Sequence, residues 1–291
     1  MKRLWIPAGA LLAMAVALGQ AQPLPAQARF HHVHLNTHDR ARSLEFYELL
    51  GALPVTFGER TEAIFTGRGF ILATETDAPL KPQDRTALRH LGWAGVDGPH
   101  EYARWQNAGL EVHTPIAPVG PDHFYYLWGP DREIVEFYTG DRNHWFNHLH
   151  FWSDDVAEAS AWYERHLGQS FRAGARVPRP AEPNRVWGNE FRLDGISFLI
   201  TYKDHYYVEA ELRLPQGRTL EPSGGSPIDH LAFSYESIAP VYERMQRDGV
   251  EIVRPLAESA EFGFDSFMVN GPDGVLVEIV EAEPVPDGLW R

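Results

Sequence analysis

Residues 30–36 read FHHVHLN, and residues 146–152 read FNHLHFW. In both stretches polar and apolar residues alternate, which is typical of a β-strand, because successive side chains of a strand point to opposite faces. His32 and His34 therefore share one face of the first strand, and its valine and leucine take the other. We expect the apolar face of each strand to pack against a core and the opposite face to carry histidine.

The two strands are followed by the same succession of motifs. A helical stretch ends in FYELLG at residues 46–51 after the first strand, and in WYERHLG at residues 162–168 after the second. Further along, a turn and a strand read GPDREIVEF at residues 129–137 and GPDGVLVEI at residues 271–279. These matches indicate an internal duplication of one structural unit.

The two copies span residues 30–140 and 145–283, and each copy is itself double. A new strand begins within each copy, at RHLGWA (residues 89–94) and at DHLAF (residues 229–233), and a helix that ends at a glycine follows each of them. The order strand, helix and then two or three strands recurs in every quarter. The sequence therefore predicts an α+β protein of four βαβββ modules that pair into two half-barrel domains.

The beginning of the chain has the features of a secretory signal peptide over residues 1–21. A positive start precedes an apolar run at residues 8–18, and a small-x-small pattern ends at Ala21. The alternative, an uncleaved membrane anchor, needs about 20 apolar residues, which is more than this run provides. We expect cleavage after Ala21, a spacer at residues 22–29, and a periplasmic or secreted mature protein that is not attached to a membrane.

The composition of the 291-residue chain limits its partners and its chemistry. Hydrophobic residues make up 44%, which is enough for a packed core. The formal net charge of −14 becomes −14 − 2 = −16 when the two basic residues of the signal peptide are removed, so nucleic acid is not an expected partner. The absence of cysteine excludes disulfides, thiolate metal ligands and a lipid-bearing cysteine. A metal ion would have to be held by histidine, carboxylate, amide oxygen or water.

The polar faces of the repeated strands carry further histidines and two glutamates. His90 and His230 oppose apolar neighbours near the start of their strands, and Glu136 and Glu278 do so on the last strand of each copy. Two imidazoles and a carboxylate that are buried without partners are energetically costly, and one divalent cation would satisfy all three. This ligand set suits Fe, Mn, Zn, Ni or Co and leaves coordination positions open for a substrate or water.

The order of these motifs resembles the vicinal oxygen chelate superfamily, which includes glyoxalases, bleomycin-resistance proteins and extradiol dioxygenases. The resemblance rests on a histidine at the start of successive modules, a glutamate on the last strand, the helix ending in Phe-Tyr-x-x-Leu-Gly and the Gly-Pro-Asp hairpin, and it covers residues 30–283. It implies glyoxalase-like half-barrels and one metal site in each copy. The implied metal ligands are His32, His90 and Glu136 in the first copy and His148, His230 and Glu278 in the second.

Three further residues are candidates for a catalytic role. Tyr126 precedes the first Gly-Pro-Asp hairpin and resembles the active-site tyrosine of the extradiol dioxygenase signature. That signature also has a histidine several residues upstream, which this sequence lacks at the matching offset, and Met268 takes the tyrosine's place in the second copy. His34 and His150 lie two residues beyond a predicted ligand on the same strand face, where they would line the cavity or orient the ligands.

Three classes of function agree with these observations. The first is a metal-dependent, dioxygenase-like enzyme in which substrate oxygens chelate the cation. The second is a lyase or isomerase of the glyoxalase type, although export argues against a version that depends on glutathione. The third is a non-catalytic binding or resistance protein of the bleomycin-resistance type. All three imply a small-molecule partner, and the sequence gives no indication of an oligomeric state.

Overall fold

The computed structural model describes residues 27–57, 61–170, 172–173, 188–204 and 217–282. The predicted signal peptide and most of the predicted spacer lie outside these residues. Within them, no helix is both long enough and apolar enough to cross a membrane.

The described elements follow the predicted βαβββ order four times. Module 1 consists of β1 (Arg29–Thr37), α1 (Arg40–Leu49), β2 (Leu53–Phe57), β3 (Thr61–Phe65) and β4 (Phe70–Glu75). Module 2 consists of β5 (Leu88–Ala94), α2 (Gly98–Asn107), β6 (Val112–Val119), β7 (Asp122–Trp128) and β8 (Ile134–Tyr138). Module 3 consists of β9 (Trp145–Ser153), α3 (Val156–Leu167), β10 (Arg172–Ala173), β11 (Gly188–Leu193) and β12 (Ile196–Tyr202). Module 4 consists of β13 (Ile228–Tyr235), α4 (Ala239–Arg247), β14 (Ile252–Glu258), β15 (Asp265–Asn270) and β16 (Leu276–Glu281).

Two short 3₁₀ turns, η1 (Gln83–Arg85) and η2 (Pro272–Gly274), complete the described elements. Three of the four helices begin in the same way. The carboxylates of Asp39, Asp97 and Asp155 accept hydrogen bonds from backbone N–H groups in the first turns of α1, α2 and α3. These N-caps satisfy donors that have no partner within the helix, and they fix where each helix leaves its preceding strand. The α+β class and the four βαβββ modules predicted from the sequence are confirmed.

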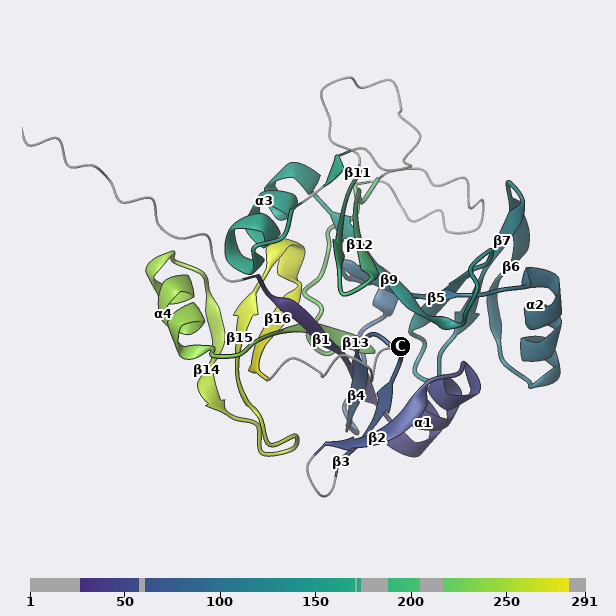
Figure 1. Cartoon of the computed structure of the whole chain (residues 1–291), viewed down its shortest axis with the longest axis horizontal. Coiled ribbons are helices and arrows are strands. Elements are labelled where there is room, and N and C mark those ends of the chain that lie inside the picture. Colours follow the sequence, from purple (N-terminus) through teal and green to yellow (C-terminus); the bar gives the residue numbers. More distant parts are fainter. Residues whose placement is uncertain (1–26, 58–60, 171, 174–187, 205–216, 283–291) are drawn as a thin grey trace, which may run out of the picture.

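The modules pair into two eight-stranded sheets (Figure 1). One sheet joins modules 2 and 3 in the order β10-β11-β12-β9-β5-β8-β7-β6, and we call it the central sheet because these modules are the middle two in the sequence. The other sheet joins modules 1 and 4 in the order β14-β15-β16-β13-β1-β4-β3-β2, and we call it the outer sheet because these modules are the first and last in the sequence. Each sheet thus combines one module from each half of the sequence.

The lengths of the connections explain this pairing. Modules 2 and 3 are joined by the short segment 139–144, so β9 turns back beside β5 as its antiparallel neighbour. The longer segments 76–87 and 203–227 connect the two sheets. β1 and β13, which are far apart in the sequence, then pair antiparallel at the centre of the outer sheet.

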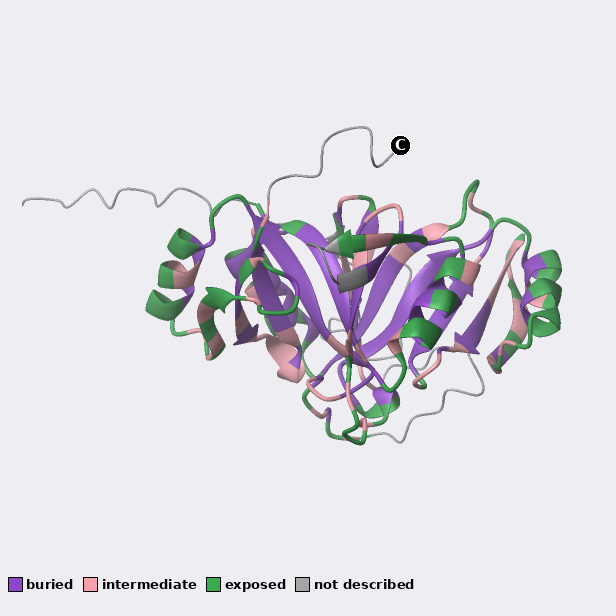
Figure 2. Cartoon of the chain, turned by 90° about the horizontal axis from the view of Figure 1, so that it is seen from below, coloured by how far each residue is buried: buried purple, intermediate pink, exposed green. Residues whose placement is uncertain are grey.

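The two sheets share one hydrophobic core. The ring of Phe30 on β1 lies 6.0 Å from that of Phe146 on β9, and Trp93 on β5 lies 5.9 Å from Tyr47 on α1. The indole Nε1 of Trp93 also donates to the carbonyl of Leu50, 3.1 Å away. Figure 2 shows the buried strands of both sheets next to one another, with α2 and α4 at the outer ends. Because the apolar side chains face this core, the alternating histidines face the opposite side of each sheet.

Candidate metal centres

Three predicted ligands converge on the central sheet, at what we call the central site. His90 comes from β5, Glu136 from β8 and His148 from β9. The Nε2 atoms of His90 and His148 each lie 2.8 Å from Oε2 of Glu136 and 3.2 Å from one another. All three side chains are buried.

A glycine makes this convergence possible. Gly92 on β5 is paired with Glu136 of β8 on one side and with His148 of β9 on the other. A Cβ atom at Gly92 would lie 2.0 Å from Nδ1 of His148. The imidazole of His148 therefore occupies the space that a larger residue would take, and no motif in the sequence marks Gly92 as part of the site.

The donor set of the central site fits a divalent cation. Two ligand atoms at right angles around a cation that is about 2.1 Å from each would be about 3.0 Å apart, close to the spacings at this site. Burial lowers the pKa of His90 to about 3, so its imidazole is neutral. Burial also opposes ionisation of Glu136, but His90 and His148 hold the pKa of this carboxyl well below its usual range. Neutral imidazole and ionised carboxylate are the states that a metal ion requires.

The central site opens onto a cavity of about 690 Å³ whose walls include Tyr126, Glu136, His148, His150 and Leu199. The rings of Tyr126 and His150 lie 5.3 and 4.9 Å from the ring of His90. Two of the three candidate catalytic residues therefore stand beside this site.

The contacts of His150 fix its protonation. Nη1 of Arg89 lies 3.3 Å from Nδ1 of His150, and Oγ1 of Thr201 lies 2.6 Å from Nε2. Since guanidinium only donates, Nδ1 accepts and Nε2 carries the proton. Burial, and then the charge of Arg89, lower the pKa of His150 well below its usual value. His150 is therefore a neutral and firmly oriented imidazole.

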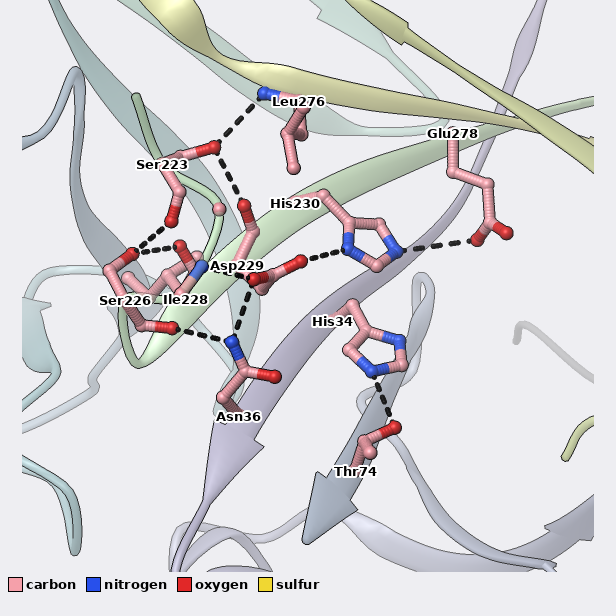
Figure 3. Close-up of polar contacts among 12 residues, drawn as sticks. His34, Asn36, Thr74, Ser223, Ser226, Ile228, Asp229, His230, Leu276 and Glu278 are labelled. Atoms are coloured by element: carbon pink, nitrogen blue, oxygen red, sulfur yellow. Dashed lines mark hydrogen bonds and ion pairs between the residues drawn. The ribbon is translucent and has the colours of Figure 1, made fainter. Parts of the chain in front are cut away.

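The remaining predicted ligands form a second cluster on the outer sheet, which we call the outer site. The Nε2 atoms of His32 on β1 and His230 on β13 lie 3.3 and 3.4 Å from Oε2 of Glu278 on β16. Figure 3 shows His230 between Asp229 and Glu278. Although burial lowers it, the pKa of His230 is raised to about 9 by these two carboxylates. His34 stacks on His230 at 4.4 Å and bonds through Nε2 to Thr74.

The six predicted ligands therefore assemble into two clusters, but not in the groups expected from the two halves of the sequence. His32 joins His230 and Glu278 rather than His90 and Glu136. His148 joins the latter pair instead. The physical reason is the pairing of module 1 with module 4 and of module 2 with module 3, which brings each first strand beside a strand from the other half.

Four β-bulges supply residues that the sequence analysis missed. In each module the residue just before the predicted ligand histidine has no opposite residue in the strand pairing and forms the bulge. These residues are His31, Arg89, Asn147 and Asp229. A bulge redirects a side chain within a strand. Consequently three of these residues reach Nδ1 of the next histidine at 2.7 Å: His31, Asn147 and Asp229. Arg89 contacts His150 instead, and Nδ1 of His90 has no hydrogen-bond partner among the described residues.

Equivalent positions in the modules show which ligand is missing from a fourfold set. Glu136 lies opposite Gly92, two residues after His90, and Glu278 lies opposite Ala232, two residues after His230. The same register position holds Leu72 in module 1 and Leu199 in module 3. Each site thus has three predicted protein ligands and a leucine where a fourth would stand.

Comparison with known proteins agrees with this architecture. The family model described as Glyoxalase/Bleomycin resistance protein/Dioxygenase superfamily matches residues 145–279. The protein named Glyoxylase I 4 from Arabidopsis thaliana is 27% identical over 74 residues, which cover 25% of this chain and 40% of that protein's length.

Two solved structures extend the likeness across both sheets. Glyoxalase I from Zea mays superposes with a TM-score of 0.64 at 16% identity, covering 88% of this chain and 92% of that one. A putative dioxygenase from Bacillus subtilis superposes with a TM-score of 0.60 at 11% identity, covering 89% and 86%. At these identities the superpositions show a shared fold.

Proposed function

We propose that this protein is an exported, metal-dependent enzyme of the vicinal oxygen chelate type, because residues 145–279 match the family model of the glyoxalase/bleomycin resistance protein/dioxygenase superfamily and the described residues have the glyoxalase-like fold. Its reaction takes place at the central site, on a small substrate that chelates a cation through neighbouring oxygens. The reaction is dioxygenase-like or of the lyase/isomerase kind.

The observation that carries this proposal is an incomplete ligand set on a cavity wall. His90, Glu136 and His148 supply three ligand atoms within 3.2 Å of one another, and Leu199 replaces the fourth. Because these three ligands lie on the wall of an open cavity, coordination positions of a cation held there remain accessible to a substrate. A divalent cation held there would supply a Lewis acid that stabilises negative charge on substrate oxygens.

The neighbouring residues take different roles. Tyr126 is buried, lines the cavity and stands beside His90, so we assign it contact with the substrate and transfer of a proton through its hydroxyl. His150 is held through both ring nitrogens, so we assign it a positioning role beside the ligands.

The experiment is a turnover assay on protein reconstituted separately with Fe²⁺, Mn²⁺, Co²⁺, Ni²⁺ and Zn²⁺, with a panel of catechols, α-hydroxy ketones and 2-oxo aldehydes. We expect turnover of one substrate class with one or more of these metals. Glu136→Gln, which keeps the shape of the side chain, should abolish turnover. Tyr126→Phe should lower kcat by about 10²- to 10⁴-fold while metal content is retained. Full turnover in Glu136→Gln would refute the assignment of the central site.

A non-catalytic binding protein is the second candidate, because the cavity could also hold a small molecule without a metal. Metal removal separates the two. The enzyme should lose both turnover and affinity for a chelating substrate, whereas a binding protein would keep its affinity in EDTA.

Export is proposed from residues 1–21 of the sequence. A periplasmic protein that begins at Gln22 is the expected result of N-terminal sequencing, and one that still begins at Met1 would contradict cleavage.

A further inference from the structure

The inward-facing atoms of the outer site are held only loosely. The Nε2 atoms of His32 and His230 are buried and lie 3.3 and 3.4 Å from the same atom, Oε2 of Glu278, which is longer than an ordinary N–H···O hydrogen bond. His32 is fully buried, and the exposed fractions of His230 and Glu278 are only 5% and 4%. One carboxylate oxygen satisfies two buried imidazole nitrogens poorly at these distances, so the arrangement points to an additional group between the three side chains.

The outward-facing atoms of the same side chains are all held. Nδ1 of His32 contacts Nδ1 of His31, and Nδ1 of His230 contacts the Asp229 carboxylate, both at 2.7 Å. Arg254 donates to Oε1 of Glu278. Such partners orient metal ligands and leave one atom of each side chain available to bind a cation.

The carboxylate of Asp229 is itself anchored, so His230 has little freedom to turn. Its Oδ1 accepts hydrogen bonds from Nδ2 of Asn36 and from the backbone N–H of Gly225, both at 2.7 Å. Figure 3 shows this chain of contacts running from the turn at Ser223 and Ser226 to Glu278.

Two aromatic side chains cover the outer site. Phe262 and Phe264 come from the segment 259–264 between β14 and β15, and their rings stack 5.9 Å apart. Phe262 lies 5.6 Å from the ring of His34, and Phe264 lies 6.0 Å from the ring of His32. At the central site the equivalent connection, between β6 and β7, is only residues 120–121, and the residues on either side of it line the open cavity.

We propose that the outer site binds a divalent cation as a closed structural centre, while chemistry is confined to the central site. The ligands are His32, His230 and Glu278, and His34, whose ring nitrogen lies within 4.8 Å of those of the other two histidines, is the nearest further donor. The cation joins β1 to β13 and β16, so it links the first module to the last. This inference rests on the proposed function only for the contrast between the two sites.

Zinc retention tests the proposal directly. The full mature protein is reconstituted with Zn²⁺ and desalted, and its zinc content is measured before and after dialysis against EDTA. We expect two equivalents before dialysis and one after it, because the covered ion exchanges slowly. His230→Ala and the isosteric Glu278→Gln should hold one equivalent before dialysis and none after. His90→Ala should hold one equivalent both before and after.

The outcomes also separate this inference from the proposed function. A wild-type protein that holds only one equivalent before dialysis, keeps it after dialysis and loses it in His230→Ala would uphold the outer centre and contradict a metal ion in the proposed active site. Loss of both equivalents from the wild type, or zinc content that His230→Ala and Glu278→Gln leave unchanged, would overturn the structural centre.

A variant of Phe262 tests whether the aromatic side chains close the outer site. Phe262→Ala should still bind two equivalents of Zn²⁺ but lose both to EDTA. The control is Leu53→Ala, which shortens an exposed apolar side chain on β2 and should keep one equivalent. A Phe262→Ala protein that retains one equivalent after dialysis would overturn the proposal that this segment closes the site.

Discussion

The residue before each predicted ligand histidine differs among the modules, and this difference sets the character of the two sites. His31, Asn147 and Asp229 hold Nδ1 of the next histidine, whereas Arg89 turns to His150. The outer site therefore places a negative charge behind a ligand. The central site places a positive charge beside its cavity instead.

This contrast predicts different pH dependences for metal binding. In the metal-free protein Asp229 and Glu278 raise the pKa of His230 to about 9 against the effect of burial, so at neutral pH the cation must displace a proton. Zinc affinity at the outer site should rise about tenfold per pH unit from pH 6 to near 9 and then level off. Burial lowers the pKa of His90 to about 3, so this residue releases no proton over the same range.

The two sites can be titrated separately in single variants. His90→Ala reports zinc binding at the outer site, and His230→Ala reports the central site. Competition with a chromophoric chelator at several pH values gives both affinities. A flat profile in His90→Ala would contradict the protonated state of His230.

At the scale of the strand, Gly92 controls the central site because two partner strands place ligands on either side of it. Gly92→Ala puts a Cβ atom where Nδ1 of His148 lies, so the imidazole must move away from Glu136. We expect zinc affinity at the central site to fall about 10- to 100-fold, similar to the loss of an orienting contact. Equilibrium dialysis in the His230→Ala background measures this value.

The outer site provides the comparison, since Ala232 occupies the equivalent position between His32 and Glu278. Ala232→Gly should leave the zinc affinity of the outer site within a fewfold of the original. An unchanged affinity in Gly92→Ala would mean that His148 binds from another position.

Strand patterns in the sequence were sufficient to predict some of these features. Alternation at residues 30–36 and 146–152 predicted which side chains face away from the core, and the repeated motifs predicted four modules. Bulges were not predictable, because an extra residue such as Asp229 leaves the local pattern of polar and apolar residues unchanged while redirecting its own side chain. The partner of Glu278, Arg254 on β14, carried no signal either, since their contact depends on strand pairing.

At the scale of the whole molecule, the order of the modules decides which ligands meet. Local motifs identify His32 and His148 equally well under either pairing, so the sequence alone favoured neighbours within each half. The short connection 139–144 and the antiparallel pairing of β5 with β9 impose the other arrangement. Both sites thus depend on contacts between the two halves of the chain, and a change that separates the halves should disrupt both together.

The most direct test of this account is the zinc stoichiometry of two double variants, measured without chelator. His90→Ala/His148→Ala removes two ligands from the central site alone, so it should retain one equivalent of Zn²⁺ per chain. His32→Ala/His90→Ala removes one ligand from each site and should retain none. If the first variant loses both equivalents while the second keeps one, the ligands belong to separate halves of the sequence, and the assembly of both sites across the halves is wrong.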